Sequence, residues 1–232
     1  MPDSPARSPT SLALPYAAPY LLYVALGSLV DLRTHAEWIY GARVLAGGGA
    51  LAFFWRDYLP LRGPRSTGGS LAAGAAVGLL GAVLWVALLA RFAAADAPAW
   101  SDSAWAARAL GATLLAPLVE ELLFRGWALR TVLLFERALR ARSSAPLGDA
   151  LDRSSLADVA PGAWSALAIA VSSALFAAGH HPGEWPAAFA YGVLMCALWI
   201  ARGDLVSCIS AHAVTNAALA LFVRASGSWG SW

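Results

Sequence analysis

The chain has 232 residues, of which 59% are hydrophobic and only 13% are charged. Soluble domains carry about 25% charged residues, so this composition excludes an ordinary soluble enzyme and predicts an integral membrane protein. The formal net charge is +2 and no basic run follows the pattern of a phosphate-binding surface, so we expect no nucleic-acid partner. Two cysteines, Cys196 and Cys208, lie in apolar segments without CxxC spacing and are predicted to be buried free thiols.

The N-terminal third of the chain alternates apolar spans with polar connections. Residues 1–13 are rich in Pro and Ser and are predicted to form a disordered tail. The third span is long enough to cross about 30 Å of hydrocarbon. The first three spans are expected over residues 14–30, 38–55 and 71–92.

A fourth helix is expected to begin near Ala104 and to continue to about Arg140. Pro117 lies inside it, where a proline predicts a kink and a carbonyl without its helical partner. Residues 141–161 are predicted to be a polar linker. Three further spans are expected over residues 164–179, 185–200 and 205–223.

These elements predict an all-α fold, namely a polytopic membrane protein with seven to eight transmembrane helices. The eighth would form if residues 126–140 re-entered the membrane. We expect a single transmembrane domain over residues 14–225, with a catalytic core at about 104–224 and a C-terminal tail at 226–232.

Arginine residues gather in alternate connections of the chain. They lie in the connection 56–69, in the region 137–153 and at Arg202. Because basic connections stay on the cytoplasmic side, this pattern predicts a multi-pass protein of the inner (cytoplasmic) membrane with a cytoplasmic N-terminus. The C-terminus and the turn after residue 180 are then expected on the outer side.

Charged residues interrupt the apolar fourth helix at Glu120, Glu121 and Arg125. Charges inside a membrane helix are costly and usually face a bundle interior or a wet cavity. Neighbouring helical residues point about 100° apart, so the two carboxylates cannot share one role. Glu121 and Arg125 are four residues apart, which predicts an ion pair and leaves Glu120 as a candidate general base. The alternative is a structural ion-pair cluster between helices.

His180 ends the fifth span, after Phe176-Ala177-Ala178-Gly179. Small residues there allow a neighbouring helix to approach closely. By itself, a histidine at a helix end is more typical of a cap than of a catalytic group.

His212 and Asn216 are four residues apart near the middle of the last span, so both face one side of it. Together they could donate two hydrogen bonds to a developing oxyanion. Hydrogen bonding between helices is the alternative interpretation of this pair.

The three motifs in order, EExxxR, FxxxH and HxxxN, resemble the CAAX-protease and bacteriocin-processing (CPBP) family of intramembrane glutamate-type endopeptidases. The resemblance covers roughly residues 104–224. The sequences around the motifs (PLVEELLFRGWALR, SSALFAAGH, ISAHAVTN) are most similar to the bacterial branch associated with exosortase-like C-terminal sorting.

The resemblance implies a role for each motif residue. Glu120 and His180 would activate the attacking water, and His212 with Asn216 would stabilise the oxyanion. Glu121 and Arg125 would be a supporting pair. We expect no cofactor and no metal; zinc stays an alternative because Glu and His can ligate it, although HExxH is absent.

The predicted function is therefore an intramembrane endopeptidase that cleaves near the membrane boundary. Its partners would be the lipid bilayer and a protein or peptide substrate with a membrane-associated tail or C-terminal sorting signal. The alternatives are a non-enzymatic immunity or processing partner of the same fold, and a proton-coupled transporter, since buried Glu and His also mark proton paths.

Overall fold

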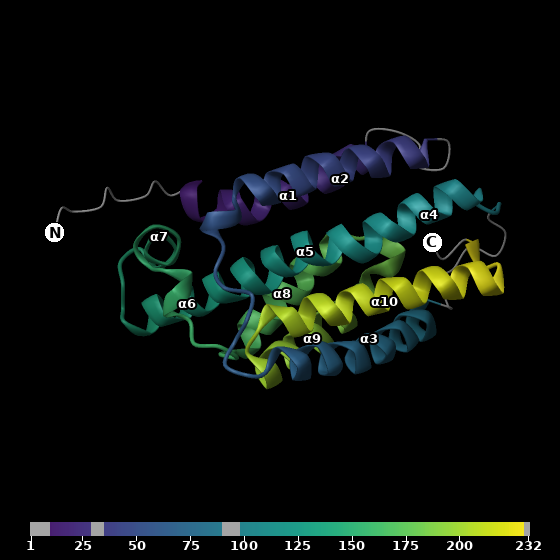
Figure 1. Cartoon of the computed structure of the whole chain (residues 1–232). Helices are drawn as coiled ribbons and strands as arrows, with labels where there is room; N and C mark the ends of the chain where they lie inside the picture. The colour runs from purple at the N-terminus through teal and green to yellow at the C-terminus, as the bar shows by residue number, and fades with distance from the viewer. Residues whose placement is uncertain (1–9, 29–34, 90–97, 230–232) are drawn as a thin grey trace.

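The computed structural model describes residues 10–28, 35–89 and 98–229, which form α-, π- and 3₁₀-helices joined by turns and loops, without any strand (Figure 1). The prediction of an all-α membrane protein is confirmed. Residues 1–9 of the expected disordered tail lie outside the described residues. The first described helix begins at Thr10.

The long helices lie side by side in two flanks. Outside residues 102–140, the bounds of the longer helices are α1 Thr10–Ser28, α2 Ala36–Phe53, α3 Thr67–Leu89, α8 Ala166–Ala178, α9 Trp185–Arg202 and α10 Leu205–Ser226. Helices α1 and α2 pack together on one flank, and α3, α9 and α10 pack on the other (Figure 1).

Among the described residues, three helical stretches are long and apolar enough to cross a membrane: Thr67–Leu89, Pro182–Arg202 and Leu205–Ser226. They correspond to the expected third, sixth and seventh spans. The expected first and fifth spans are shorter apolar helices, Ala13–Gly27 and Ala166–Ala178. Length and apolarity therefore single out three of the seven expected spans.

The expected fourth helix is a continuous rod from Asp102 to Arg140, which confirms its extension to about Arg140. The side chain of Ser101 caps its start by accepting a hydrogen bond from the Ala104 amide at 3.1 Å. The rod consists of α4 Asp102–Leu110, the π-helical η2 Gly111–Leu115, α5 Ala116–Glu121, the π-helical η3 Leu122–Ala128 and α6 Leu129–Arg140.

Pro117 leaves one carbonyl of this rod without its helical partner, as the sequence predicts. At the end of η2 the amide of Ala116 donates to the carbonyl of Gly111, five residues back. In that register the next donor would be the amide of Pro117 and its acceptor the carbonyl of Ala112. Proline has no N–H, so the Ala112 carbonyl is open to another donor.

The expected polar linker 141–161 is more ordered than the sequence indicates. It forms the short helical segments α7 Pro146–Gly148, η4 Asp149–Arg153 and η5 Leu156–Asp158. Leu156 and Val159 are buried, and the Leu156 carbonyl accepts a hydrogen bond from Arg130 at 3.2 Å. The linker is therefore partly anchored, because a few of its apolar side chains pack in the core beside the rod.

Helix α3 approaches α10 closely because small residues face it. A Cβ atom at Gly74 would lie 2.6 Å from the Ser207 carbonyl oxygen, and one at Gly78 would lie 2.5 Å from that of Ala211. Small residues four apart permit such backbone contact between membrane helices. This contact sets the position of α10, which carries His212 and Asn216.

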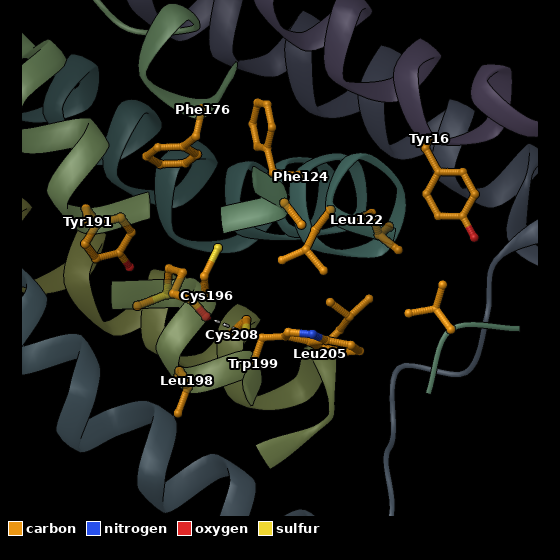
Figure 2. Packing of buried hydrophobic residues seen from close by; sticks show 14 of the residues in the cluster. Tyr16, Leu122, Phe124, Phe176, Tyr191, Cys196, Leu198, Trp199, Leu205 and Cys208 are labelled. Atoms are coloured by element: carbon orange, nitrogen blue, oxygen red, sulfur yellow. Dashed lines mark hydrogen bonds between the residues drawn. The ribbon is translucent and has the colours of Figure 1, made fainter. Parts of the chain in front are cut away.

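Aromatic side chains fill the interior where the rod, α8 and α9 meet. Figure 2 shows Phe124, Phe176 and Tyr191 around this interior, and the rings of Phe124 and Phe176 are 5.3 Å apart, edge to face. Cys196 and Cys208 are buried free thiols, as predicted. The packed interior holds α8, α9 and the rod in fixed positions around the polar groups.

Candidate active site

A cavity of about 290 Å³ lies between the rod, α8, α10 and the helices α1 and α2. Glu120 lines it from α5, His180 from the residues that follow α8, and His212 and Asn216 from α10. These are the four residues to which the sequence assigns catalytic roles. The long rod makes the meeting possible, because it places Glu120 well inside the bundle.

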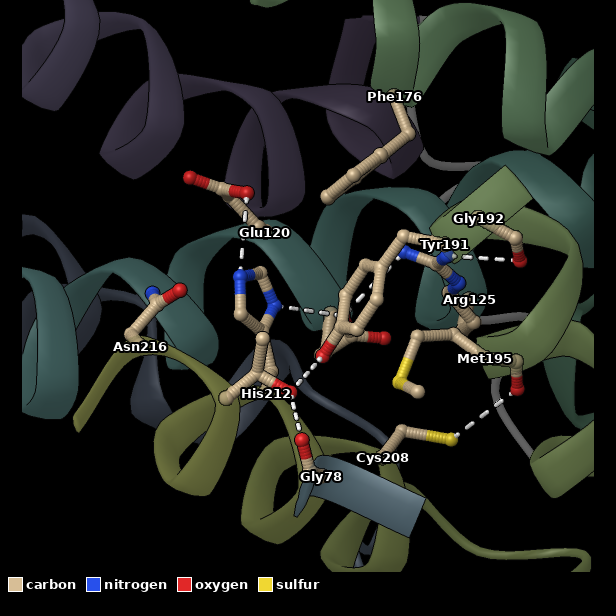
Figure 3. A network of polar contacts seen from close by, with 12 residues as sticks. Gly78, Glu120, Arg125, Phe176, Tyr191, Gly192, Met195, Cys208, His212 and Asn216 are labelled. Carbon is tan, nitrogen blue, oxygen red and sulfur yellow. Dashed lines mark hydrogen bonds and ion pairs between the residues drawn. The ribbon is translucent and has the colours of Figure 1, made fainter. Parts of the chain in front are cut away.

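His212 lies between the two glutamates (Figure 3). Its Nδ1 atom is 2.9 Å from Oε1 of Glu121, and its Nε2 atom is 3.8 Å from Oε2 of Glu120. Because an ionised carboxylate only accepts, Nδ1 carries the proton in this hydrogen bond. Glu121 thus orients the imidazole ring and directs Nε2 toward Glu120 and the cavity.

Glu121 and Arg125 form the ion pair that their spacing predicts. The Arg125 guanidinium is 3.2 Å from Oε1 of Glu121, and both side chains are completely buried. A second Arg125 nitrogen donates to the carbonyl of Gly192 on α9 at 3.0 Å. A buried charge needs such partners, so Arg125 keeps Glu121 ionised and available to His212.

Glu120 faces the cavity with an unsatisfied carboxylate. Among the described residues, no hydrogen-bond partner reaches its buried Oε2 atom. The 3.8 Å to His212 is too long for a direct hydrogen bond. The lone pairs of Glu120 are therefore open to a molecule bound in the cavity.

His180 combines the two roles that the sequence leaves open. Its Nδ1 atom is 2.9 Å from the Phe176 carbonyl oxygen, so it donates to the last turn of α8 as a helix cap does. The ring packs against those of Phe176 and Trp85, with centroids 4.7 and 5.4 Å away. Nδ1 is thus committed to the helix, which leaves Nε2 as the ring nitrogen that can interact with a ligand.

Asn216 forms a hydrogen bond with the backbone carbonyl that Pro117 leaves without a helical partner. Its Nδ2 atom donates to the carbonyl of Ala112 at 2.7 Å. An amide nitrogen carries two hydrogens, so one remains to donate into the cavity. The π-helical segment and Pro117 therefore orient the Asn216 side chain.

Two features of the site are missed by the sequence analysis. Tyr191 donates to Thr215 at 3.1 Å and Thr215 donates to the Gly78 carbonyl at 2.8 Å, a chain that ties α9, α10 and α3 together. Thr215 lies three residues after His212 on the same helix, and this spacing already indicated that the two side chains share a face. Arg43 on α2 also lines the cavity.

In the part of the chain that the structure describes, no three His, Cys, Asp or Glu side chains are arranged to hold a metal ion. His212 uses Nδ1 for Glu121 and His180 uses Nδ1 for a backbone carbonyl. The described side chains therefore offer no ready metal-ligand set.

The fold and the cavity define a class: an α-helical membrane protein in which Glu120, His180, His212 and Asn216 line one polar cavity. Residues 102–218, half of the 232, match the family described as type II CAAX prenyl endopeptidase, Rce1-like. The chain belongs to this family, which is a family of proteases, and the resemblance seen in its motifs is confirmed. No curated protein and no solved structure matches the chain.

Proposed function

We propose that the protein is a glutamate-type intramembrane endopeptidase that hydrolyses a peptide bond of a membrane-associated protein. The observation that carries this proposal is the convergence of Glu120, His180, His212 and Asn216 on one cavity. Each keeps a hydrogen-bonding atom available there: carboxylate oxygens, two imidazole Nε2 atoms and one amide hydrogen.

Glu120 and His180 would bind the attacking water. The Glu120 carboxylate takes a proton from the water while the oxygen of that water bonds to the scissile carbonyl carbon. The protonated Glu120 then gives that proton to the amine nitrogen as the carbon–nitrogen bond breaks. The water is consumed and the carboxylate is restored, so no other reactant is needed.

Asn216 and His212 would stabilise the tetrahedral intermediate. Asn216 donates its free amide hydrogen to the oxyanion. His212 can donate from Nε2 only as an imidazolium, because the bond to Glu121 commits the proton of its neutral form to Nδ1. Glu121 accepts the hydrogen bond from Nδ1 and so holds the ring with Nε2 directed into the cavity, which gives Glu121 a role beyond charge balance.

We further propose that the reaction needs no metal. Exhaustive chelation of the purified protein should leave its cleavage rate unchanged, and elemental analysis should find no zinc. A rate that falls on chelation and returns with zinc would contradict this.

The position of the cavity suggests where the substrate is cleaved. The cavity lies at the end of the bundle that holds the α8–α9 turn. The arginine-rich connection 56–69 reaches the opposite end, where the amide of Leu205 donates a hydrogen bond to the carbonyl of Leu61. With the N-terminus in the cytoplasm of the inner membrane, the cavity would open outward. That orientation favours a C-terminal sorting signal over a cytoplasmic tail as substrate.

The central experiment compares the C-termini of membrane proteins, by mass spectrometry, in cells that carry the wild-type or the Glu120→Gln chain. New C-termini should appear only with the wild type. Glu136→Gln, on the same rod but outside the cavity, is the matched control and should behave as the wild type. An identified substrate should then be cleaved by the purified wild type alone.

Other outcomes would favour the rival functions. A cellular phenotype that survives Glu120→Ala, with no cleaved product, would indicate a non-enzymatic immunity or processing partner. Flux through proteoliposomes without cleavage would indicate a proton-coupled transporter.

A further inference from the structure

A second cavity lies at the end of the bundle that carries the basic connection 56–69. It has a volume of about 740 Å³ and lies between the C-terminal end of α2, that connection and the rod. The connection passes the rod on its way from α2 to α3 (Figure 1). None of the described residues lines both this cavity and the candidate active site, so the two are separate. We call the second cavity the α2 pocket.

The wall that the connection forms is tied to the helices on both sides. The Tyr58 hydroxyl donates to the carbonyl of Pro15 on α1 at 2.8 Å. The carbonyl of Leu61 accepts from the amide of Leu205, at the start of α10, at 2.9 Å. The α2 pocket is therefore preformed, as ligand sites of about 300–1,000 Å³ usually are.

The lining of the α2 pocket is apolar apart from one charge. Leu118 and Leu122 are four residues apart, so they form a stripe along the rod. Leu118 is only partly buried, as is Leu51 on the facing wall. Among the described residues that line the pocket, Arg56 alone carries a charge. This lining matches an apolar chain with one anionic end.

Arg56 is exposed and its charge is not compensated by a neighbouring acid. In residues 10–28, 35–89 and 98–229, no carboxylate lies within 4.0 Å of its guanidinium. Arg62 and Arg65 follow on the same connection and are also exposed. The rim of the pocket is therefore positive, which favours an anionic ligand over a zwitterionic one.

Exposed aromatic residues mark the level of the pocket in the membrane. Phe53 and Trp55 are 80% and 70% exposed, directly before Arg56. Aromatic side chains gather at the boundary between the hydrocarbon and the head groups, and arginine reaches the phosphates there. Basic pockets between membrane helices on the cytoplasmic side bind anionic head groups.

We propose that the α2 pocket binds an anionic phospholipid, with its phosphate at Arg56 and one acyl chain along Leu118 and Leu122. The bilayer around the protein supplies this ligand, and a guanidinium matches a phosphate through paired, charge-assisted hydrogen bonds. The inference goes beyond the proposed function and does not depend on it, because no residue of the candidate active site takes part.

The test counts the lipids that stay bound to the full chain. The protein is reconstituted in nanodiscs of equal parts phosphatidylcholine and phosphatidylglycerol, transferred to detergent and measured by native mass spectrometry. We expect phosphatidylglycerol to be retained over phosphatidylcholine by at least about fivefold. Glycerol phosphate, which has no acyl chain, should not displace it, because the apolar wall contributes to binding.

Variants assign the bound lipid to the α2 pocket. Arg56→Gln should remove the preference for phosphatidylglycerol, and Arg56→Lys should retain most of it. Arg140→Gln, exposed outside the pocket, is the matched control for charge and should bind as the wild type does.

A second pair of variants tests the apolar wall. Leu118→Trp fills the pocket and should lower the retention of phospholipid. Leu114→Trp, on the same rod but outside the pocket, is its matched control and should leave retention unchanged, since that side chain is 63% exposed. Thermal unfolding of each variant checks that the fold is retained.

Several results would overturn the proposal. Equal retention of both lipids by the wild type would do so, as would an undiminished preference in Arg56→Gln. An equal loss in Arg140→Gln would indicate attraction to the whole basic surface instead of a site. Recovery of a free fatty acid in place of a phospholipid would also contradict it, as would lipid-free dimers that Leu118→Trp dissociates, because a second copy would then cover the pocket.

Discussion

At the scale of single residues, Glu120 and Glu121 have the same type of side chain in different environments. Glu121 is completely buried between Arg125 and His212, and both of its neighbours hold it as an anion. Glu120 faces the cavity, and no described residue forms a hydrogen bond with its Oε2 atom. Because the two point about 100° apart on the helix, one can order the site while the other meets the substrate.

We predict that Arg125→Gln lowers the free energy of unfolding by about 3–5 kcal/mol, because Glu121 would be left as a buried charge without its cation. Unfolding in mixed micelles measures this. The control is Arg153→Gln, which breaks the Arg153–Asp149 pair. That arginine side chain is 79% exposed, so the loss should be no more than about 1 kcal/mol. Equal losses would contradict the assignment of a buried, stabilising pair.

At the scale of elements, the rod departs from regular α-helix twice, at η2 and at η3. π-helical segments of this kind occur frequently at functional sites. The first ends directly before Pro117 and leaves the Ala112 carbonyl for Asn216. The second contains Arg125, whose guanidinium reaches both Glu121 and the backbone of α9.

We predict that Pro117→Ala lowers kcat about tenfold while the fold is retained or gains stability, since the rod regains an amide donor. That amide would compete with Asn216 for the Ala112 carbonyl. Asn216→Ala alone should cost roughly 10²–10³ in kcat. If Pro117 acts through Asn216, the double variant should be no slower than Asn216→Ala, and additive losses would show that the two act independently.

We predict that Gly78→Ala destabilises the protein by about 1–3 kcal/mol and lowers activity, because the added methyl group would meet the Ala211 carbonyl and force α3 away from α10. The movement would also weaken the bond from Thr215 to the Gly78 carbonyl. Gly68→Ala, on the same helix with open space around it, should change stability by no more than about 0.5 kcal/mol. Thermal unfolding of both variants checks this.

At the scale of the whole molecule, the cavity lies toward one end of the bundle and the basic connections toward the other. Gly63 in the connection 56–69 packs against Gly203, in the turn between α9 and α10. The C-terminal end of α10 lies at the opposite end (Figure 1). Access to the cavity is thus separated from the arginines that are expected to stay in the cytoplasm.

We predict that a cysteine placed at Ser226 reacts in intact cells with a maleimide that cannot cross the inner membrane. A cysteine at Pro64 should react only after permeabilisation. The native cysteines are buried and should contribute little background. The reverse labelling pattern would place the cavity on the cytoplasmic side and would favour a cytoplasmic substrate tail.

Features that depend on composition or on neighbouring turns of a helix could be predicted from the sequence. Low charge and long apolar runs determine an all-α membrane protein. The four-residue spacing places Arg125 beside Glu121, and it places His212 and Asn216 on one face, because helical periodicity is local. The free carbonyl near Pro117 also follows from the missing N–H of proline.

Only the tertiary structure decided which of these groups meet. The bond from His212 to Glu121 joins residues 91 apart in the chain, and that from Asn216 to Ala112 joins residues 104 apart. Both depend on the π-helical register of the rod and on the close contact between α3 and α10, which no periodicity encodes. The sequence by itself therefore determined the class of protein and the local pairs, whereas helix packing decided how the polar groups meet around the cavity.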